Sequence, residues 1–308
     1  MTKHILITGA ARFIGSSLAE RLSRNPDYNL TLVDNFLTGK EEFVLKKENT
    51  HFIKADVNDY EDIAPIMTAQ RFDYVFHYAA VVGVDRTLKH PVMVLEDIDG
   101  LKNVLSLSKN TGVKRIFFSS SSEVYGEPVE IPQNENTTPL NARLPYAIVK
   151  NLGEAFLRSY HQEFGLEYTI FRFFNTYGQR QSSDFVMSKF IKKALHDEDI
   201  PVYGDGSQTR TFCFIEDNLD ATTNAFENNL FVNDVVNIGS DIEVSIKELA
   251  EIIIKATNSQ SQIIHLPPLK EGDMTRRKPD VTNMKKLLNH DFTPLEEGIK
   301  RILASIKK

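Results

Sequence analysis

The chain has 308 residues, 41% of them hydrophobic and 25% charged, and its formal net charge is −6. This composition is typical of a globular protein and excludes a disordered or collagen-like chain. The acidic balance argues against general nucleic-acid binding, because phosphate backbones attract basic surfaces. No stretch approaches the roughly 18 consecutive apolar residues of a membrane span, the first residues lack a signal-peptide pattern, and the single Cys213 excludes an internal disulfide or a cysteine-based zinc site. We therefore expect a soluble, cytoplasmic protein without a metal site.

The order of the predicted elements indicates an α/β fold. Short apolar runs predict strands at residues 4–8, 29–34, 51–56, 73–80, 114–121 and 168–174. Helical spacing predicts helices at 13–23, 91–109 and 146–164, then at 215–228, 245–256 and 294–305, with a turn-rich loop at 204–207. Alternation of strands and helices is typical of a Rossmann-like, doubly wound parallel sheet. We expect this sheet in residues 1–175, with later segments partly returning to it, and residues 176–308 mainly in a smaller, mixed α/β C-terminal lobe.

The segment TGAARFIG, residues 8–15, lies between the first predicted strand and the first helix, where a Rossmann fold binds phosphate. Gly9 allows the tight turn, and Gly15 allows the helix to pack closely on the strand. The first helical residues, Phe13 and Ile14, present backbone N–H groups to a pyrophosphate. The segment therefore predicts a dinucleotide site.

The ends of the next strands complete this predicted site. Asp34 lies 19 residues after Gly15, where a carboxylate can bond both ribose hydroxyls and would repel a 2′-phosphate, which favours NAD over NADP. Asp56 ends the third strand and fits an adenine contact. The neighbouring residues of the same strand ends are included in the predicted NAD site: Asn35, Val57, Ala79 and Ala80. Residues 1–175 are thus predicted to bind NAD, and residues 176–308 mainly to bind substrate.

Arg12 departs from the glycine pattern, because it stands where the second glycine normally lets the backbone approach the pyrophosphate. Three interpretations stay open. The side chain points into solvent while the loop keeps its shape, the guanidinium contacts the cofactor phosphates, or the arginine impairs cofactor binding.

Tyr146 and Lys150 are the central catalytic candidates. They lie four residues apart in a predicted helix and therefore on one face of it. A tyrosine of pKa about 10 is a poor base at neutral pH. A neighbouring ammonium and a positively charged nicotinamide both favour the phenolate and lower that pKa. Tyr-x-x-x-Lys is common by chance, so its position after the fifth strand gives it weight.

Motifs along almost the whole chain resemble one superfamily. They are TGAARFIG, LVDNF, the Asp-Val of KADV, HYAA, SSSSEVYG, YAIVK, RFFNTYGQRQ, VYGDGSQTRTFCFIED and TRRKPD. The chain resembles the extended branch of the short-chain dehydrogenases/reductases, which contains nucleotide-sugar epimerases, dehydratases and decarboxylases. The resemblance implies a tightly held NAD, transient hydride removal from C4 of the sugar, and a 4-keto intermediate whose fate defines the enzyme.

The resemblance also implies roles for particular residues. Tyr146 is the base, Lys150 holds the nicotinamide ribose, and Ser121 bonds the reacting hydroxyl, although a serine at a strand end is also a common cap. Ser122 and Glu123 follow it in the substrate site. The implied substrate contacts from later in the chain are Asn175, Arg210 and Arg277.

Two features of these assignments stay open. Residues 276–278 carry three positive charges, and the alternative to substrate binding is a solvated charge run. Asp97 departs from the family pattern, because it stands at what resembles an asparagine position near the cofactor. His77, at a strand end, is expected to be packed rather than to bind metal.

Glu123 divides the possible reactions. The resembling 4,6-dehydratases place Asp and then Glu before VYG, whereas this chain has Ser122 and Glu123, which disfavours dehydration. UDP-glucuronate decarboxylases and some epimerases carry Ser-Glu, and a loop carboxylate bonded to backbone is the simplest alternative. The short segment after Arg180 resembles UDP-sugar 4-epimerases more than decarboxylases. We therefore favour a UDP-hexose 4-epimerase and keep the decarboxylase second.

A protein that binds NAD and a sugar nucleotide without turnover is the alternative from a different class, given Arg12 and Asp97. The intact set of Ser121, Tyr146 and Lys150 disfavours it. The resemblance further implies a homodimer, formed through the Tyr146 helix and the helix that follows Pro91.

Overall fold

The computed structural model describes residues 2–83, 87, 89–268 and 276–306. The chain divides into two compact units. The first, here called the sheet unit, comprises Met1–Val124, Ala142–Arg172 and Thr222–Val236. The second unit comprises Tyr125–Asn141, Phe173–Ala221 and Asn237–Lys308. Each unit is therefore built from segments that are far apart in the sequence.

The sheet unit is organised around a seven-stranded sheet of order β11-β6-β5-β4-β1-β2-β3. The pairs from β3 to β5 are parallel, as predicted for a Rossmann-like fold. Buried apolar side chains fill the central strands, and Ile5, Leu6 and Ile7 have no exposed surface. The strands are β1 Lys3–Thr8, β2 Tyr28–Asp34, β3 Thr50–Lys54, β4 Tyr74–His77, β5 Arg115–Ser121, β6 Glu167–Phe173 and β11 Asp234–Ile238.

The strand order reverses between β1 and β4, and ligands of such sheets bind beyond the carboxyl ends of the strands at this point. The predicted strand at residues 73–80 is too long at this end. Strand β4 ends at His77 because the backbone N–H groups of Tyr78 and Ala79 turn to Thr8 Oγ1, each at 3.2 Å. The third strand likewise ends at Lys54, before the predicted end at residue 56.

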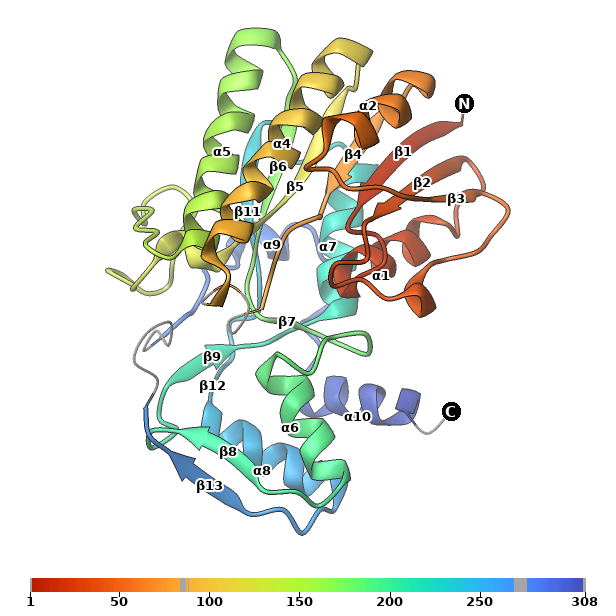
Figure 1. The fold of residues 1–308 in the computed structure, drawn as a ribbon. Coiled ribbons are helices and arrows are strands. Elements are labelled where there is room, and N and C mark those ends of the chain that lie inside the picture. Colours follow the sequence, from red (N-terminus) through yellow and green to blue (C-terminus); the bar gives the residue numbers. More distant parts are fainter. Residues whose placement is uncertain (1, 84–86, 88, 269–275, 307–308) are drawn as a thin grey trace. The chain divides into compact units, whose positions relative to one another are not determined.

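Helices α2, α4 and α5 lie side by side on one face of the sheet (Figure 1). Leu6 and Phe118 belong to the core beneath them. Phe117, whose side chain points to the opposite face by strand alternation, packs instead against Phe226 of α7. The helices are α1 Phe13–Leu22, α2 Tyr60–Ala69, α4 Pro91–Thr111, α5 Pro145–Phe164 and α7 Ile215–Glu227, with short 3-10 turns η1 Glu41–Phe43 and η2 Ser122–Tyr125.

Helix α2 is absent from the elements predicted by sequence, and Pro65 inside it opposes helix formation. Two features overcome this cost. Asp59 caps the helix by accepting a hydrogen bond from Glu61 N at 2.9 Å, and Ile63 and Met67 are fully buried one turn apart. Residues 60–69 therefore form a helix largely because of tertiary packing.

The second unit combines helices with short strand pairs. Strand β12 pairs antiparallel with β9, β13 pairs parallel with β8, and β10 pairs parallel with β7. Strands of two to four residues carry too little periodicity to be predicted. The elements are β7 Thr176–Tyr177, α6 Val186–Leu195, β8 Ile200–Tyr203, β9 Thr209–Thr211, β10 Cys213–Phe214, β12 Glu243–Ser245, α8 Ile246–Thr257, β13 Ile263–Leu266, α9 Thr282–Lys285 and α10 Leu295–Ile306.

The late helices are confirmed by α7, α8 and α10, whose ends lie within one residue of those predicted. Helix α8 has the clearest start signal. Ser245 accepts from Glu248 N, while the Glu248 carboxylate accepts from Ser245 N, which makes a capping box. In the described part of the chain, no helix combines the length and the apolar character needed to cross a bilayer.

Candidate active site

The loops that follow β1 and β4 are in direct contact. Thr8 Oγ1, buried between them, also lies 3.0 Å from Nδ1 of His77. Gly9 has φ +69°, and a Cβ there would lie 2.8 Å from Ala79 N. A Cβ on Gly15 would clash with the Gly9 carbonyl oxygen. The two glycines are therefore required by this close approach, as the sequence predicts.

Helix α1 begins directly after this turn. Its N-cap, Arg12, has extended backbone and makes no capping side-chain hydrogen bond. The N–H groups of a first helical turn lack partners within the helix and carry partial positive charge. Half-buried Phe13 and Ile14 begin this turn, so the end of α1 fits a pyrophosphate.

Asp34 lies beside the same loop and is only 5% exposed. Its carboxylate accepts hydrogen bonds from Ala11 N at 3.0 Å and Phe36 N at 2.8 Å. These bonds hold the glycine loop against the end of β2. The next residue, Asn35, donates from Nδ2 to Asp56 Oδ2 at 2.9 Å. The structure thus brings the predicted adenosine contacts together, with Asp34 also supporting the loop.

Helix α5 carries the central candidates. Lys150 is 3% exposed, and its Nζ lies 5.8 Å from the centroid of the Tyr146 ring. The same Nζ lies 4.8 Å from the Phe118 ring centroid and donates to Ser119 Oγ at 3.4 Å. Burial lowers the pKa of Lys150 to about 8, partly offset by the negative charge of Asp97. The ammonium is therefore held over β5, next to the phenol.

The pKa of Tyr146 is raised by burial to about 12. A hydrogen bond with Ser121 and the charge of Arg12 lower it, while the carboxylate of Glu123 raises it. The pKa of Tyr146 is therefore raised, not lowered as expected from the sequence, because burial outweighs the hydrogen bond with Ser121 and the charge of Arg12.

Ser121 is 7% exposed at the end of β5, and its Oγ accepts a hydrogen bond from Glu123 N at 3.2 Å. The strand-end cap considered from the sequence is therefore present, and the same side chain also bonds Tyr146. Glu123 lies in η2, and its negative charge raises the pKa of Tyr146. Ser122, which stands between Ser121 and Glu123 in the sequence, is buried.

Arg12 and Asp97, the two departures from the family pattern, meet at one peptide group. Arg12 Nη1 donates to the Ala80 carbonyl oxygen, so the guanidinium does not simply point into solvent. Val81 N donates to Asp97 Oδ2 at 2.6 Å. The carbonyl of residue 80 and the N–H of residue 81 belong to the same peptide bond. Burial raises the pKa of Asp97, and its bonds to Val81 and Asn58 and the charges of Lys150 and Arg12 oppose that rise.

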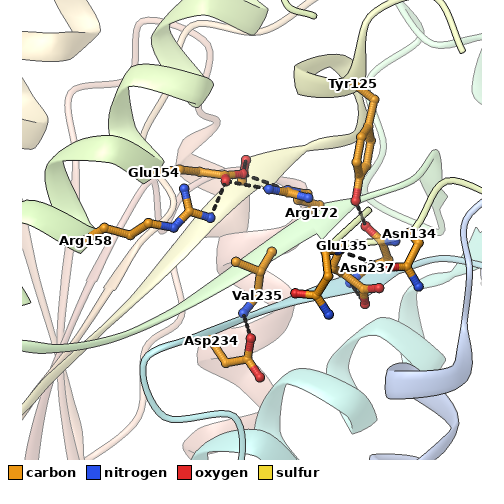
Figure 2. A network of polar contacts seen from close by, with 11 residues as sticks. Tyr125, Asn134, Glu135, Glu154, Arg158, Arg172, Asp234, Val235 and Asn237 are labelled. Atoms are coloured by element: carbon orange, nitrogen blue, oxygen red, sulfur yellow. Dashed lines mark hydrogen bonds and ion pairs between the residues drawn. The ribbon is translucent and has the colours of Figure 1, made fainter. Parts of the chain in front are cut away.

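A buried ion pair absent from the sequence predictions anchors α5 (Figure 2). Glu154 accepts from Arg172 Nη2 at 2.7 Å and Arg172 Nε at 2.9 Å, and both side chains are almost completely buried. Glu154 also accepts from Ser120 Oγ at 2.7 Å and from Arg158 at 3.2 Å. Because residues 146, 150 and 154 repeat every four positions, they share one helix face. That spacing was the available signal.

The predicted substrate contacts from later in the chain lie in the second unit. Asn175, with φ +36°, donates from Nδ2 to the Thr211 carbonyl at 3.0 Å, next to Arg210 in β9. Arg210 and Arg277 are 8% and 6% exposed. A β-bridge joins Thr209 to residue 276, so the structure brings the three candidates near β9.

The three positively charged residues at 276–278 differ in their surroundings. Arg276 and Lys278 both pair with Glu243, at 2.9 and 3.3 Å. Arg277, in contrast, is buried. The interpretation of a uniformly solvated run is therefore wrong for Arg277.

His77, at the end of β4, is packed against the core. It is 2% exposed and stacks on Phe118, so its predicted packing is confirmed. Among the residues that the structure describes, no group of three or more His, Cys, Asp or Glu side chains is placed to hold a metal ion. Tyr125, which follows the Glu123 motif, donates to Asn237 Oδ1 at 2.7 Å in the second unit (Figure 2).

Comparison with known proteins identifies the family. The family model described as "NAD dependent epimerase/dehydratase family" matches residues 5–239. The chain belongs to this NAD-dependent epimerase/dehydratase family. NAD is accordingly its cofactor, and the glycine loop, the uncapped start of α1 and Asp34 fit that group. Arg12 is the exception within this fit.

Members of the family with different reactions are similar to this chain. A UDP-N-acetyl-alpha-D-glucosaminuronate decarboxylase of Bacillus cytotoxicus is 36% identical over 98% of this chain and 97% of the relative. The structure of a UDP-glucose 4-epimerase of Thermotoga maritima with UDP-glucose is 32% identical, with TM-score 0.93 and coverage of 99% and 98%. That of a Thermus thermophilus UDP-glucose 4-epimerase with NAD is 27% identical, with TM-score 0.90 and coverage of 99% of each chain. The family is thus an enzyme family of nucleotide-sugar chemistry.

Proposed function

We propose that the protein is a UDP-hexose 4-epimerase that oxidises C4 of the sugar and reduces the 4-keto intermediate from its other side. The observation that carries the proposal is that Tyr146 and Lys150 share one face of α5, with the buried ammonium of Lys150 5.8 Å from the centroid of the phenol ring. Ser121, at the end of β5, lowers the pKa of Tyr146. A phenol near the start of α5, a cation one turn further along the same helix and a hydroxyl at the end of β5 are the kinds of group that C4 oxidation requires.

Each of these side chains has a separate task in the proposal. Tyr146 accepts the proton of the C4 hydroxyl, and Ser121 orients that hydroxyl by a second hydrogen bond. Bound beside these residues, NAD would supply the hydride acceptor for C4, and its positive ring would favour the phenolate of Tyr146. Lys150 is proposed to hold the nicotinamide ribose, because its buried ammonium lies beside the phenol ring.

Arg210, Arg277 and Asn175 are proposed to bind the diphosphate of the substrate. Phosphate is a good partner for the planar donor fork of a guanidinium. These residues would supply the local positive charge that a protein of net charge −6 needs for a dianionic ligand.

The second candidate is decarboxylation of a UDP-hexuronate. The relative of Bacillus cytotoxicus that is 36% identical favours it, and in this alternative Glu123 would act on the C5 carboxylate or proton. The direct connection from β7 to α6, without an intervening element, supports the short loop on which the epimerase proposal rests. A 4,6-dehydratase is disfavoured, because Ser122 replaces the acid.

Proton NMR of reactions with UDP-glucose, UDP-N-acetylglucosamine and UDP-glucuronate separates these possibilities. A 4-epimer supports the proposal, and a UDP-pentose with release of carbon dioxide supports the decarboxylase. Inertness towards all three, with NAD bound, supports the non-catalytic binding protein. Tyr146→Phe is the matched control, and we expect it to lose activity by a factor of at least 10² to 10⁴, the usual range for a removed acid–base group. Wild-type rates in this variant would overturn the assignment of the base.

The homodimer expected from the sequence remains part of the proposal. Helices α4 and α5, which pack side by side, expose large apolar side chains: Val92 at 68%, Leu95 at 43%, Ile148 at 42% and Leu152 at 43%. Exposed apolar groups on adjacent helices favour a contact with a second copy. Sedimentation velocity should give twice the mass of the chain, and a monomer at micromolar concentration would contradict this.

A further inference from the structure

The peptide group between Ala80 and Val81 is bound at both ends by charged side chains. Arg12 donates to its carbonyl oxygen, and Asp97 accepts from its N–H at 2.6 Å. This peptide lies three residues beyond β4, at the position where the strand order reverses. Arg12 and Asp97 come from different elements, the start of α1 and the middle of α4. One peptide therefore couples the two elements.

The same two side chains act electrostatically on the catalytic candidates. The charge of Arg12 lowers the pKa of both Tyr146 and Lys150, whereas Asp97 raises both. The guanidinium thus extends from the glycine loop to the carbonyl of Ala80 and acts electrostatically on Tyr146 and Lys150. It extends from the position where a Rossmann loop normally has no side chain, so that the cofactor can approach the backbone.

We infer that Arg12 is a gate for NAD: its guanidinium, held on the Ala80 carbonyl and balanced by Asp97, covers the nicotinamide end of the cofactor site and must leave before NAD binds completely. The inference rests on the proposed function only in placing the nicotinamide beside Tyr146 and Lys150. Arg12 and Asp97 are then a matched pair, because the positive charge added at one position is balanced by the negative charge added at the other.

The gate makes a specific prediction about which part of NAD is affected. Binding is opposed by the cost of breaking the Arg12 contact and by repulsion between the guanidinium and the positive nicotinamide ring. A nucleotide that lacks the nicotinamide half avoids both effects. Arg12 should therefore weaken the binding of NAD while leaving the binding of ADP unchanged.

Calorimetric titration of nucleotide-free protein with NAD and with ADP tests the gate. We expect Arg12→Gly to tighten NAD about tenfold or more, equivalent to the loss of one contact of about 1.4 kcal/mol, and to change the ADP dissociation constant less than twofold. The amount of NAD that co-purifies should rise in parallel. Arg24→Gln, which removes an exposed positive charge just after α1, should change neither constant.

Asp97→Asn tests the coupling, because asparagine can still accept the Val81 N–H and only the charge is lost. We expect this change to weaken NAD binding several-fold in the wild-type background, because the guanidinium loses its balancing charge, and to change it less than twofold in the Arg12→Gly background. Equal effects in both backgrounds would show that the residues act independently and would overturn the pairing.

Two other outcomes would overturn the gate. If Arg12→Gly weakens NAD and ADP alike, the guanidinium grips the pyrophosphate. If it changes neither, the side chain does not contact the cofactor path. None of these titrations contains a sugar nucleotide, so failure of the proposed epimerase reaction would leave the result on the gate intact, and the reverse also holds.

Discussion

Two groups of opposite charges in the sheet unit differ in how completely their side chains are bonded. The carboxylate of Glu154 accepts two hydrogen bonds from Arg172 and one from Ser120. These bonds outweigh its burial, and the pKa of Glu154 falls below its usual value. Asp97 accepts a hydrogen bond from Val81 N, and the positive charges of Lys150 and Arg12 stabilise its ionised form. Burial outweighs these effects, so the pKa of Asp97 rises.

The difference separates a structural pair from a group that a ligand can rearrange. A buried carboxylate whose hydrogen bonds are all made stabilises the ionised form and fixes the elements that it joins. A carboxyl group whose pKa is raised by burial has an ionised form that is poorly stabilised. Charges that arrive nearby therefore change its protonation state readily. Glu154 therefore positions α5, whereas Asp97 and Arg12 are the pair proposed above to respond to NAD.

The largest expected effect on stability follows from breaking the closed pair. Glu154→Ala leaves the Arg172 guanidinium buried without its carboxylate, and breaking a buried pair in this way costs about 3–5 kcal/mol. Urea unfolding monitored by circular dichroism measures the loss. Glu163→Ala, at an exposed position of the same helix, should change the free energy of unfolding by about 0.5 kcal/mol or less. Equal losses in the two variants would contradict the role of Glu154.

Lys150→Met should give the opposite combination of effects. Methionine keeps the length of the side chain but removes a buried charge whose pKa is lowered to about 8, so the free energy of unfolding should stay constant or increase. Activity should fall about a hundredfold or more, because the proposed ribose contact and the charge beside Tyr146 would be lost. Unfolding titrations and initial rates on the same preparation test the contrast, which fails if stability and activity fall together.

The smallest effect is the dependence of stability on pH. The pKa of Glu154 is lowered from 4.5 in the folded protein, so its contribution is complete above that value and is lost as the pH falls below it. The pKa of Asp97 is raised from 3.8, so its contribution is complete below that value and is lost as the pH rises through the raised pKa. These opposite signs follow from the difference in bound protons between the folded and unfolded states.

Two isosteric variants measure these contributions separately in nucleotide-free protein. Glu154→Gln should remove part of the decline in the free energy of unfolding on the acidic side of pH 4.5. Asp97→Asn should remove part of the decline that begins above pH 3.8. Urea titrations at steps of pH give both slopes, and a change of the same sign in the two variants would refute the comparison.

Much of the fold was predictable from local sequence signals. Apolar runs predicted the central strands, and the spacing of Tyr146 and Lys150 predicted that they share one helix face, because strand and helix periods are properties of adjacent residues. Helix α2 was missed because Pro65 opposes it locally and the buried Ile63 and Met67 favour it only through packing.

The sequence by itself determined the glycine turn at Gly9, the acidic end of β2 at Asp34 and the motif of Tyr146 and Lys150, because each depends on residues close together in the chain. Only the tertiary structure decided that Arg12 reaches the carbonyl of Ala80, 68 positions away, and that Glu154 closes on Arg172. Such partners depend on which strands become neighbours in the sheet. Periodicity predicts that a strand forms, but the contacts made at its end depend on the elements packed around it.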